Sequence, residues 1–151
     1  SRPRGNARTP MQWNYGPQAG FTDGTPWIKV DERYPEINVK MQRDDPESVF
    51  SHYKNLIALR KTEDVLTGGR YVRLDEGHPQ VFAYARENDR DTLIVVSNFT
   101  SEQATFTLPE ASAALGHYRL KLLSGNSAEA PTMGDRLEVS PSASFMMINR
   151  A

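Results

Sequence analysis

The pattern of apolar and polar positions divides the sequence into three stretches. Residues 1 to about 40 follow neither a helical nor a strand period. Proline and glycine interrupt them repeatedly, at Pro3, Gly5, Pro10, Gly16, Pro17, Gly20, Gly24 and Pro26 among other positions. An irregular run of this length is uncommon inside a self-contained domain, so we expect a part of the protein outside this sequence to order it.

The second stretch predicts one helix. Asp45 is the expected N-cap, Pro46 suits the first helical position, and Glu47 is favourable at the positive end of the helix dipole. Apolar residues then recur on one helical face, at Val49, Phe50, Tyr53, Leu56 and Ile57. The helix is expected to stop at Gly68-Gly69.

From Arg70 onward the pattern predicts short strands separated by turn-forming clusters. The expected strands are 70–74, 80–87, 92–99, 103–108, 117–123, 135–139 and 143–149. Several short strands joined by turns favour a small antiparallel β-sandwich. The predicted fold class is therefore mostly β, and an irregular stretch and one helix precede the strands in the sequence.

Composition excludes several kinds of partner. The 151 residues are 38% hydrophobic and 25% charged with a formal net charge of −1, which gives no reason to expect a nucleic acid or a membrane. No apolar run approaches the roughly 18 residues of a membrane span. Cysteine is absent, which fits a reducing cytoplasm. The sequence does not begin with Met, and we expect it to be a C-terminal piece of a longer protein.

Two side-chain types give no sign of bound groups or modification. The three histidines, His52, His78 and His117, stand alone without ligand spacing, so no metal site and no cofactor are expected. The tripeptide Asn98-Phe99-Thr100 matches a glycosylation sequon, and we interpret it as a coincidence.

The irregular stretch carries the most specific motif. It contains Asn6-Ala7-Arg8-Thr9-Pro10-Met11-Gln12-Trp13, followed by Ala19-Gly20-Phe21-Thr22 and Gly24-Thr25-Pro26-Trp27-Ile28. It resembles the segment after the last barrel strand in the oligo-1,6-glucosidases and related α-glucosidases of glycoside hydrolase family 13, where this run lines the sugar pocket. One departure is Gly5, where the family usually has Asp.

The resemblance implies a domain organisation and an activity. Residues 1–66 would be the C-terminal end of a (β/α)₈ catalytic barrel, its last loop and final helix, and residues 67–151 the β-sandwich called domain C. The full-length protein would be a retaining α-glucosidase that hydrolyses α-glucosidic bonds of short oligosaccharides, which requires two carboxyl groups about 5–5.5 Å apart. In the family these carboxylates come from earlier barrel strands, so no catalytic residue is expected here and the chain alone is predicted to be inactive.

Two arginines are the candidate substrate-binding residues. In the family, the arginine at the position of Arg8 reaches the sugar bound at the non-reducing end. A guanidinium has five donors and stays charged, so it can bind a sugar hydroxyl and keep a carboxylate ionised. Arg4 is a second candidate near the aglycone side, although Gly5 removes a possible acidic partner. We interpret Trp13 and Trp27 as packing the loop against the barrel, and Gln12 as satisfying loop backbone groups.

Alternative functions remain open from the sequence. A sucrose isomerase or another glucosyl-transferring relative shares the same segment, whereas a trehalose synthase tends to carry Gly-Val in place of Asn6-Ala7. A non-catalytic carbohydrate-binding β-sandwich would need a row of exposed aromatic residues on one sheet face. Tyr71, Tyr84 and Tyr118 fall on different predicted strands, which argues against it. Without a barrel to cover the apolar helix face, the isolated chain is expected to self-associate.

Overall fold

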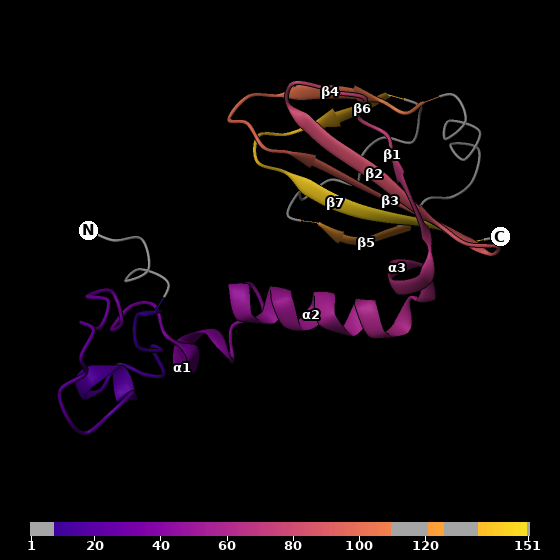
Figure 1. Ribbon diagram of the computed structural model, residues 1–151. Helices are drawn as coiled ribbons and strands as arrows, with labels where there is room; N and C mark the ends of the chain where they lie inside the picture. Colours follow the sequence, from indigo (N-terminus) through magenta and orange to yellow (C-terminus); the bar gives the residue numbers. More distant parts are fainter. Residues whose placement is uncertain (1–7, 110–120, 126–135, 151) are drawn as a thin grey trace. The chain divides into compact units, whose positions relative to one another are not determined.

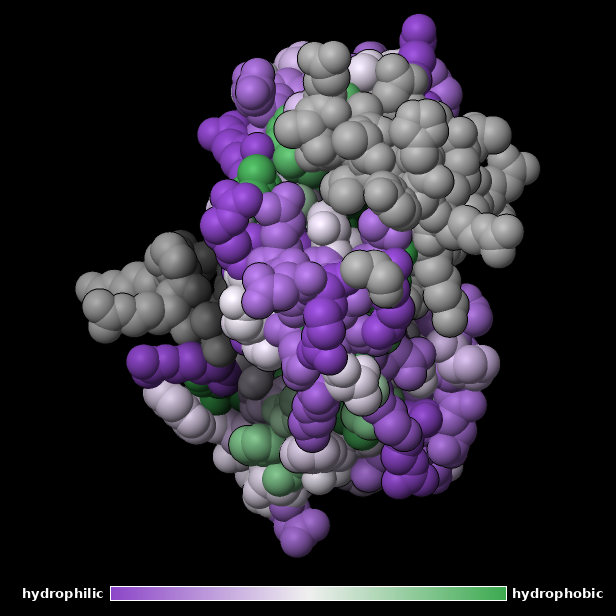
Figure 2. Space-filling view, turned by 90° about the vertical axis from the view of Figure 1, so that its right-hand side faces the viewer, coloured by the Kyte–Doolittle hydropathy of each residue, from purple (hydrophilic) through white to green (hydrophobic). Residues whose placement is uncertain are grey.

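The computed structural model describes residues 8–109, 121–125 and 136–150 (Figure 1). The chain folds into two compact units, residues 1–59 and 60–151. The predicted boundary between residues 66 and 67 stays a prediction. The face shown in Figure 2 is mostly hydrophilic, with hydrophobic residues in separate patches. None of the described helices is long and apolar enough to cross a bilayer.

The first unit is largely irregular over residues 8–38, as the sequence predicts. Its regular elements are the short 3₁₀ helix η2 (Pro17–Gly20), helix α1 (Val39–Gln42) and helix α2 (Val49–Thr62), which continues past residue 59. Neither η2 nor α1 was expected, because a single turn gives too few positions to show a helical period.

The predicted start of the helix was wrong. Asp45 does not cap α2; its side chain accepts a hydrogen bond from Glu47 N at 2.9 Å and closes a turn before the helix. Ser48 caps the helix instead, because its Oγ accepts from Ser51 N at 3.1 Å. Asp and Ser both favour N-cap positions, so residue type alone does not decide between Asp45 and Ser48.

The predicted stop at Gly68-Gly69 is confirmed, because α3 (Asp64–Gly68) ends there with Gly69 as its C-cap. The helical region is not one continuous helix, however: it breaks at the extended residue Glu63, between α2 and α3. The Glu63 carboxylate accepts two hydrogen bonds from Arg150, at 2.7 and 2.9 Å, and an ion pair of this kind has no signal in local sequence.

Seven strands occur in the described residues, each close to its predicted position. They are β1 (Arg70–Arg73), β2 (Val81–Glu87), β3 (Asp91–Asn98), β4 (Ala104–Thr107), β5 (Lys121–Gly125), β6 (Arg136–Val139) and β7 (Ser144–Arg150). One sheet has the order β1-β2-β3-β7-β5 and the other pairs β4 with β6, and every pairing is antiparallel. The start of the strand predicted at 117–123 lies outside the described residues.

The main core lies between the two sheets. Alternate residues of β2, β3 and β7 are buried against β4 and β6, with Val81, Ala83, Ile94, Val96, Phe145 and Met147 facing Ala104, Phe106, Leu137 and Val139. A second cluster lies on the opposite face of the five-stranded sheet, where Val65 of α3 packs on Leu93 and Ile148. The strands therefore carry apolar residues on both faces, which explains the nearly continuous apolar run of β3.

A buried amide joins the ends of several strands. Asn98 is 3% exposed, and its Nδ2 donates to the carbonyl oxygens of Glu102 at 2.7 Å and Val139 at 3.1 Å. Its Oδ1 accepts from the backbone N–H and the hydroxyl of Thr100, at 2.9 and 2.8 Å. The asparagine of the apparent sequon is thus a structural residue that satisfies buried backbone groups.

We predict that Asn98→Asp destabilises the β-sandwich by about 2–3 kcal/mol at neutral pH, because a carboxylate replaces the donor that faces buried carbonyl oxygens. Thermal and urea unfolding measure the change. Asn88→Asp is the matched control. Among the described residues its side chain bonds only through Oδ1, which accepts from Arg90 N and Asp91 N, so the change should stay within about 0.5 kcal/mol. Equal effects of the two substitutions would contradict the assignment.

Candidate functional site

Arg8 lies at the start of the described part of the chain. Its side chain is exposed, and it makes no hydrogen bond or ion pair with another described residue. The second candidate, Arg4, lies outside the described residues. The guanidinium of Arg8 therefore keeps its donors available for a ligand or a partner.

The segment that follows Arg8 is held by hydrogen bonds to the start of α1. Gln12 O accepts from Val39 N at 2.9 Å, and Trp13 O accepts from Lys40 N at 3.0 Å. The Gln12 side chain donates to Ile37 O at 2.6 Å, which confirms its interpretation as a residue that satisfies loop backbone groups. The loop thus has internal order in addition to any contact with the rest of the protein.

A tight left-handed turn follows. Gln18 and Ala19 have φ values of 52° and 57°, and Gly20 has 67°. The turn buries Ala19, whose carbonyl oxygen accepts from the N–H groups of Trp13 and Asn14 at 2.9 and 3.1 Å. Two consecutive non-glycine residues in this region are costly, and they persist only where surrounding contacts determine the backbone.

The two tryptophans are exposed within the described residues. Trp27 is 87% exposed and Trp13 is 50% exposed. Their predicted role in packing the loop against a barrel stays a prediction.

Side-chain hydrogen bonds join α1 to the start of α2. Asn38 caps α1, its Oδ1 accepting from Met41 N at 3.0 Å, while its Nδ2 donates to Tyr34 O at 2.8 Å. Gln42 Oε1 accepts from Phe50 N at 3.2 Å, and Ser48 Oγ donates to Gln42 O at 2.6 Å. These bonds fix α1, the loop and the first turns of α2 as one arrangement.

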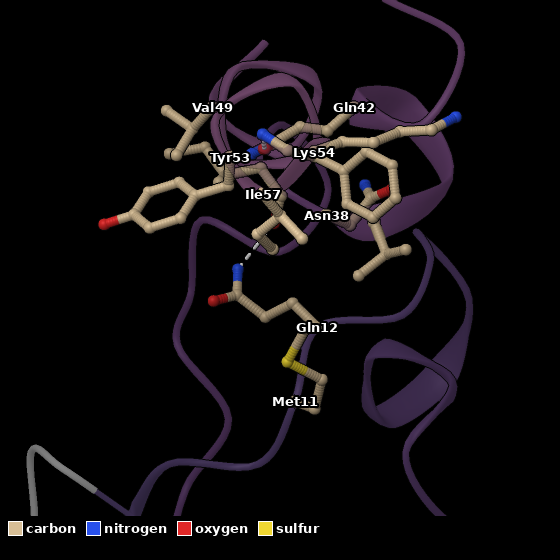
Figure 3. Close-up of a pocket in the computed structure, with 11 residues that line it drawn as sticks. Met11, Gln12, Asn38, Gln42, Val49, Tyr53, Lys54 and Ile57 are labelled. Carbon is tan, nitrogen blue, oxygen red and sulfur yellow. Dashed lines mark hydrogen bonds between the residues drawn. The ribbon is translucent and has the colours of Figure 1, made fainter. Parts of the chain in front are cut away.

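A groove of about 570 Å³ opens between these elements (Figure 3). Met11, Ile37, Val39, Val49, Phe50, Tyr53 and Ile57 supply its apolar lining, and Gln12, Asn38, Gln42 and Lys54 supply polar groups. Three of these polar side chains, Gln12, Asn38 and Gln42, already bond to backbone groups. The groove therefore suits apolar side chains better than a sugar, which needs several free donors and acceptors.

The carboxyl groups with shifted pKa values do not suit acid catalysis. Hydrogen bonds from the Arg33 side chain and backbone lower the pKa of Asp31 to about 2. Hydrogen bonds from Lys29 and from Arg73 lower the pKa values of Glu32 and Asp75, respectively. A glycosidic general acid needs a raised pKa, and no shifted carboxyl of the described part has one.

A metal centre has no support among the residues that the structure describes. No group of three or more His, Cys, Asp or Glu side chains gathers there in a way that could hold an ion.

The aromatic residues of β1 and β2 correct one argument from the sequence. Tyr71 and Tyr84 lie on different strands but are not scattered, because their ring centroids are 5.3 Å apart in a stacked arrangement. The ring centroid of Phe82 lies 5.6 Å from that of Tyr84, so Phe82 extends the cluster. Tyr118 lies outside the described residues.

Comparison with models of protein families shows the family to which the chain belongs. Residues 1–69 match the α-amylase catalytic domain, and residues 71–145 match the maltogenic amylase C-terminal domain. The chain belongs to glycoside hydrolase family 13. The predicted fold class is confirmed: an antiparallel β-sandwich follows the last loop and final helix of a barrel.

Three relatives within family 13 show the extent of the similarity. The oligo-1,6-glucosidase of Heyndrickxia coagulans is 44% identical over 129 residues, which are 85% of this chain and 22% of that protein. The solved structure of Bacillus licheniformis trehalose-6-phosphate hydrolase has a TM-score of 0.92 at 38% identity and matches 100% of this chain and 27% of that chain. An isomaltulose synthase mutant from Erwinia rhapontici, solved with D-glucose, has a TM-score of 0.84 at 35% identity, over 98% of this chain and 26% of that chain.

The chain therefore spans about a fifth of the length of the curated relatives it matches and about a quarter of the length of the chains in the matching solved structures. Of the two predicted binding residues, the structure places Arg8 at the surface of the loop, and Arg4 lies outside the described residues. Sequence reasoning missed Asn38 and Gln42, which shape this family 13 segment. The only signal was for Asn38, an amide side chain of a type that favours helix N-caps.

We predict that Gly20→Ala disrupts the left-handed turn. The backbone of Gly20 has a φ of +67°, and an added Cβ would lie 2.3 Å from Asn14 Nδ2. The turn should therefore lose about 1–3 kcal/mol of local stability. Hydrogen exchange of the Trp13 and Asn14 amides should be faster. Gly24→Ala is the control, because its Cβ would meet nothing closer than 3.8 Å; equal protection in both variants would show that the turn is not strained.

Proposed function

We propose that this chain is the C-terminal part of a retaining α-glucosidase that hydrolyses α-glucosidic bonds of short oligosaccharides. The observation that carries the proposal is the match of both halves of the chain to family 13, together with relatives named oligo-1,6-glucosidase at 44–49% identity. The proposed partner is an oligosaccharide, and the proposed location is the cytoplasm.

In this proposal, Arg8 contributes to the sugar pocket and the catalytic carboxylates come from outside the chain. The guanidinium donates to a sugar hydroxyl, and its charge keeps the nearby nucleophile ionised. The hydrogen bonds of Gln12 and Trp13 to residues 37–40 support this role, because they fix the backbone just after Arg8. Arg4 is proposed to lie nearer the aglycone.

The division of labour along the chain follows the same proposal. Residues 1–66 complete the barrel, and residues 67–151 form domain C. The chain alone is inactive, because a binding loop cannot replace the two carboxyl groups that cleave the bond.

A glucosyl-transferring enzyme is the second candidate. The specific observation in its favour is the isomaltulose synthase mutant with a TM-score of 0.84. Analysis of the products from sucrose distinguishes the two: glucose and fructose indicate hydrolysis, and a rearranged disaccharide indicates transfer.

We predict that Arg8→Ala in the full-length enzyme lowers kcat/KM at least about 10²-fold, which corresponds to about 2.7 kcal/mol of transition-state stabilisation. The reason is the loss of a charged donor beside the reacting sugar. The measurement is turnover of a nitrophenyl α-glucoside, together with thermal unfolding, which should change little because Arg8 is exposed.

Two controls accompany this experiment. Arg33→Ala removes an exposed arginine that is paired with Asp31, and it should leave turnover unchanged. Residues 1–151 alone should show no turnover. Near-normal kinetics of Arg8→Ala, or activity of the isolated chain, would contradict the proposal.

The groove beside α2 supports the proposed self-association of the isolated chain. No residue of α2 is buried, and Val49, Tyr53 and Ile57 are each more than half exposed. Covering the five residues of the predicted apolar face would contribute roughly 7–15 kcal/mol of gross burial. In the full-length enzyme, barrel elements would occupy this groove.

We predict that Ile57→Glu abolishes self-association, because it places a charge in the apolar groove. Light scattering after size exclusion, over a wide concentration range, measures the oligomeric state. Asn55→Glu introduces the same charge at an exposed position outside the groove lining and should leave association intact. A chain that stays monomeric at every concentration contradicts the prediction.

A further inference from the structure

Asn38 is a buried residue whose two polar atoms both bond to the backbone. It is 3% exposed and lies directly before α1. Its Oδ1 accepts from Met41 N at 3.0 Å in the first turn of the helix, and its Nδ2 donates to Tyr34 O at 2.8 Å in the turn before it. Asn38 therefore fixes the residue at which α1 begins.

The first turn of α1 also holds the Arg8 loop, by which we mean residues 8–14. The first four N–H groups of a helix have no partner within the helix. In α1, Val39 N donates to Gln12 O at 2.9 Å and Lys40 N donates to Trp13 O at 3.0 Å, while Asn38 takes the N–H of the next residue. The carbonyl groups of the Arg8 loop and the side chain of Asn38 thus cap the same helical turn together.

Little backbone freedom separates these bonds from Arg8. Pro10 is buried, its ring fixes its own φ, and it restricts Thr9 before it to extended backbone. On the other side, the N–H groups of Trp13 and Asn14 donate to Ala19 O. A shift in the first turn of α1 would therefore move the backbone that carries Arg8.

We propose that Asn38 is a positioning residue for Arg8. Its buried amide does not touch the sugar. By capping α1, it keeps Val39 N and Lys40 N in the arrangement that holds the Arg8 loop, so that the guanidinium is in place before the substrate binds. A group that is placed in advance spares the reaction the entropy of ordering it. This inference rests on the proposed function, because it concerns the reaction in which Arg8 takes part there.

The kinetic test compares Asn38→Ala, Arg8→Ala and the double variant in the full-length enzyme. Asn38→Ala removes the cap and should lower kcat/KM for a nitrophenyl α-glucoside about tenfold. In the Arg8→Ala background, the same substitution should change kcat/KM less than about twofold, because a residue that acts through Arg8 loses its effect once the guanidinium is gone. A general loss of folded enzyme would instead lower turnover by the same factor in both backgrounds.

Two further variants check the route. Asn38→Ser keeps an oxygen of a type that caps helices well, so its kcat/KM should lie within about threefold of the parent value. Asn55→Ala removes an exposed amide of α2 that makes no side-chain hydrogen bond with another described residue, and it should leave kcat/KM unchanged.

Hydrogen exchange on residues 1–151 tests the geometry without any activity. In Asn38→Ala, the amides of Val39 and Lys40 should exchange at least about tenfold faster, because their partners lie in a loop that is no longer fixed. The amides of β3 should be unaffected, which shows that the variant still folds. A full-length protein without glucosidase activity would overturn the proposed function, and the exchange result would still decide whether Asn38 orders the loop.

Three results would overturn the inference. The first is unchanged exchange at Val39 and Lys40 in Asn38→Ala. The second is a loss of turnover of equal factor with and without the Arg8 side chain. The third is an equal loss in Asn38→Ser and Asn38→Ala, which would show that capping is not the route.

Discussion

Irregular backbone must satisfy its polar groups without the help of a helix or a sheet ladder, and this constraint governs the whole chain. Amide side chains meet it at the decisive positions. Gln12 donates to Ile37 O, Asn38 caps α1 and holds Tyr34 O, and Gln42 accepts from the start of α2. Asn98 does the same at the end of β3. The position of the Arg8 loop and the shape of the groove both follow from these bonds.

The sequence predicted the strands and the stop of the helical region well, but it missed the start of that region and its internal break, for a physical reason. Strand positions follow from alternation, which the buried faces of β2 and β7 preserve residue by residue. The start of α2 depends on which of two capping residues closes the turn, and Ser48 does so instead of Asp45. Glu63, at the break, pairs with Arg150, which is far away in sequence. Such contacts form only once the fold exists.

The candidate site shows the same division. The motif around Arg8 was sufficient to indicate the family, because a long irregular run with this composition is rarely repeated by chance. The meeting of Tyr71 and Tyr84 could not be predicted, since it needs the register of β1 on β2. In that register Tyr71 faces Arg86 and Tyr84 faces Arg73, so the two rings are diagonal neighbours. A count of aromatic residues per strand hides this arrangement.

Exposed apolar surface gathers at two places in this molecule. In the groove, Val49, Phe50 and Ile57 surround polar side chains that are already bonded to backbone, so further burial there leaves few new polar groups unsatisfied. That surface favours apolar protein side chains. The polar groups beside Tyr71 and Tyr84 are paired as well, Arg73 with Asp75 and the Ser97 hydroxyl with that of Ser144. Because the neighbouring polar groups are already paired at both places, burial of either surface costs little in lost hydrogen bonds, and both surfaces suit packing against protein side chains.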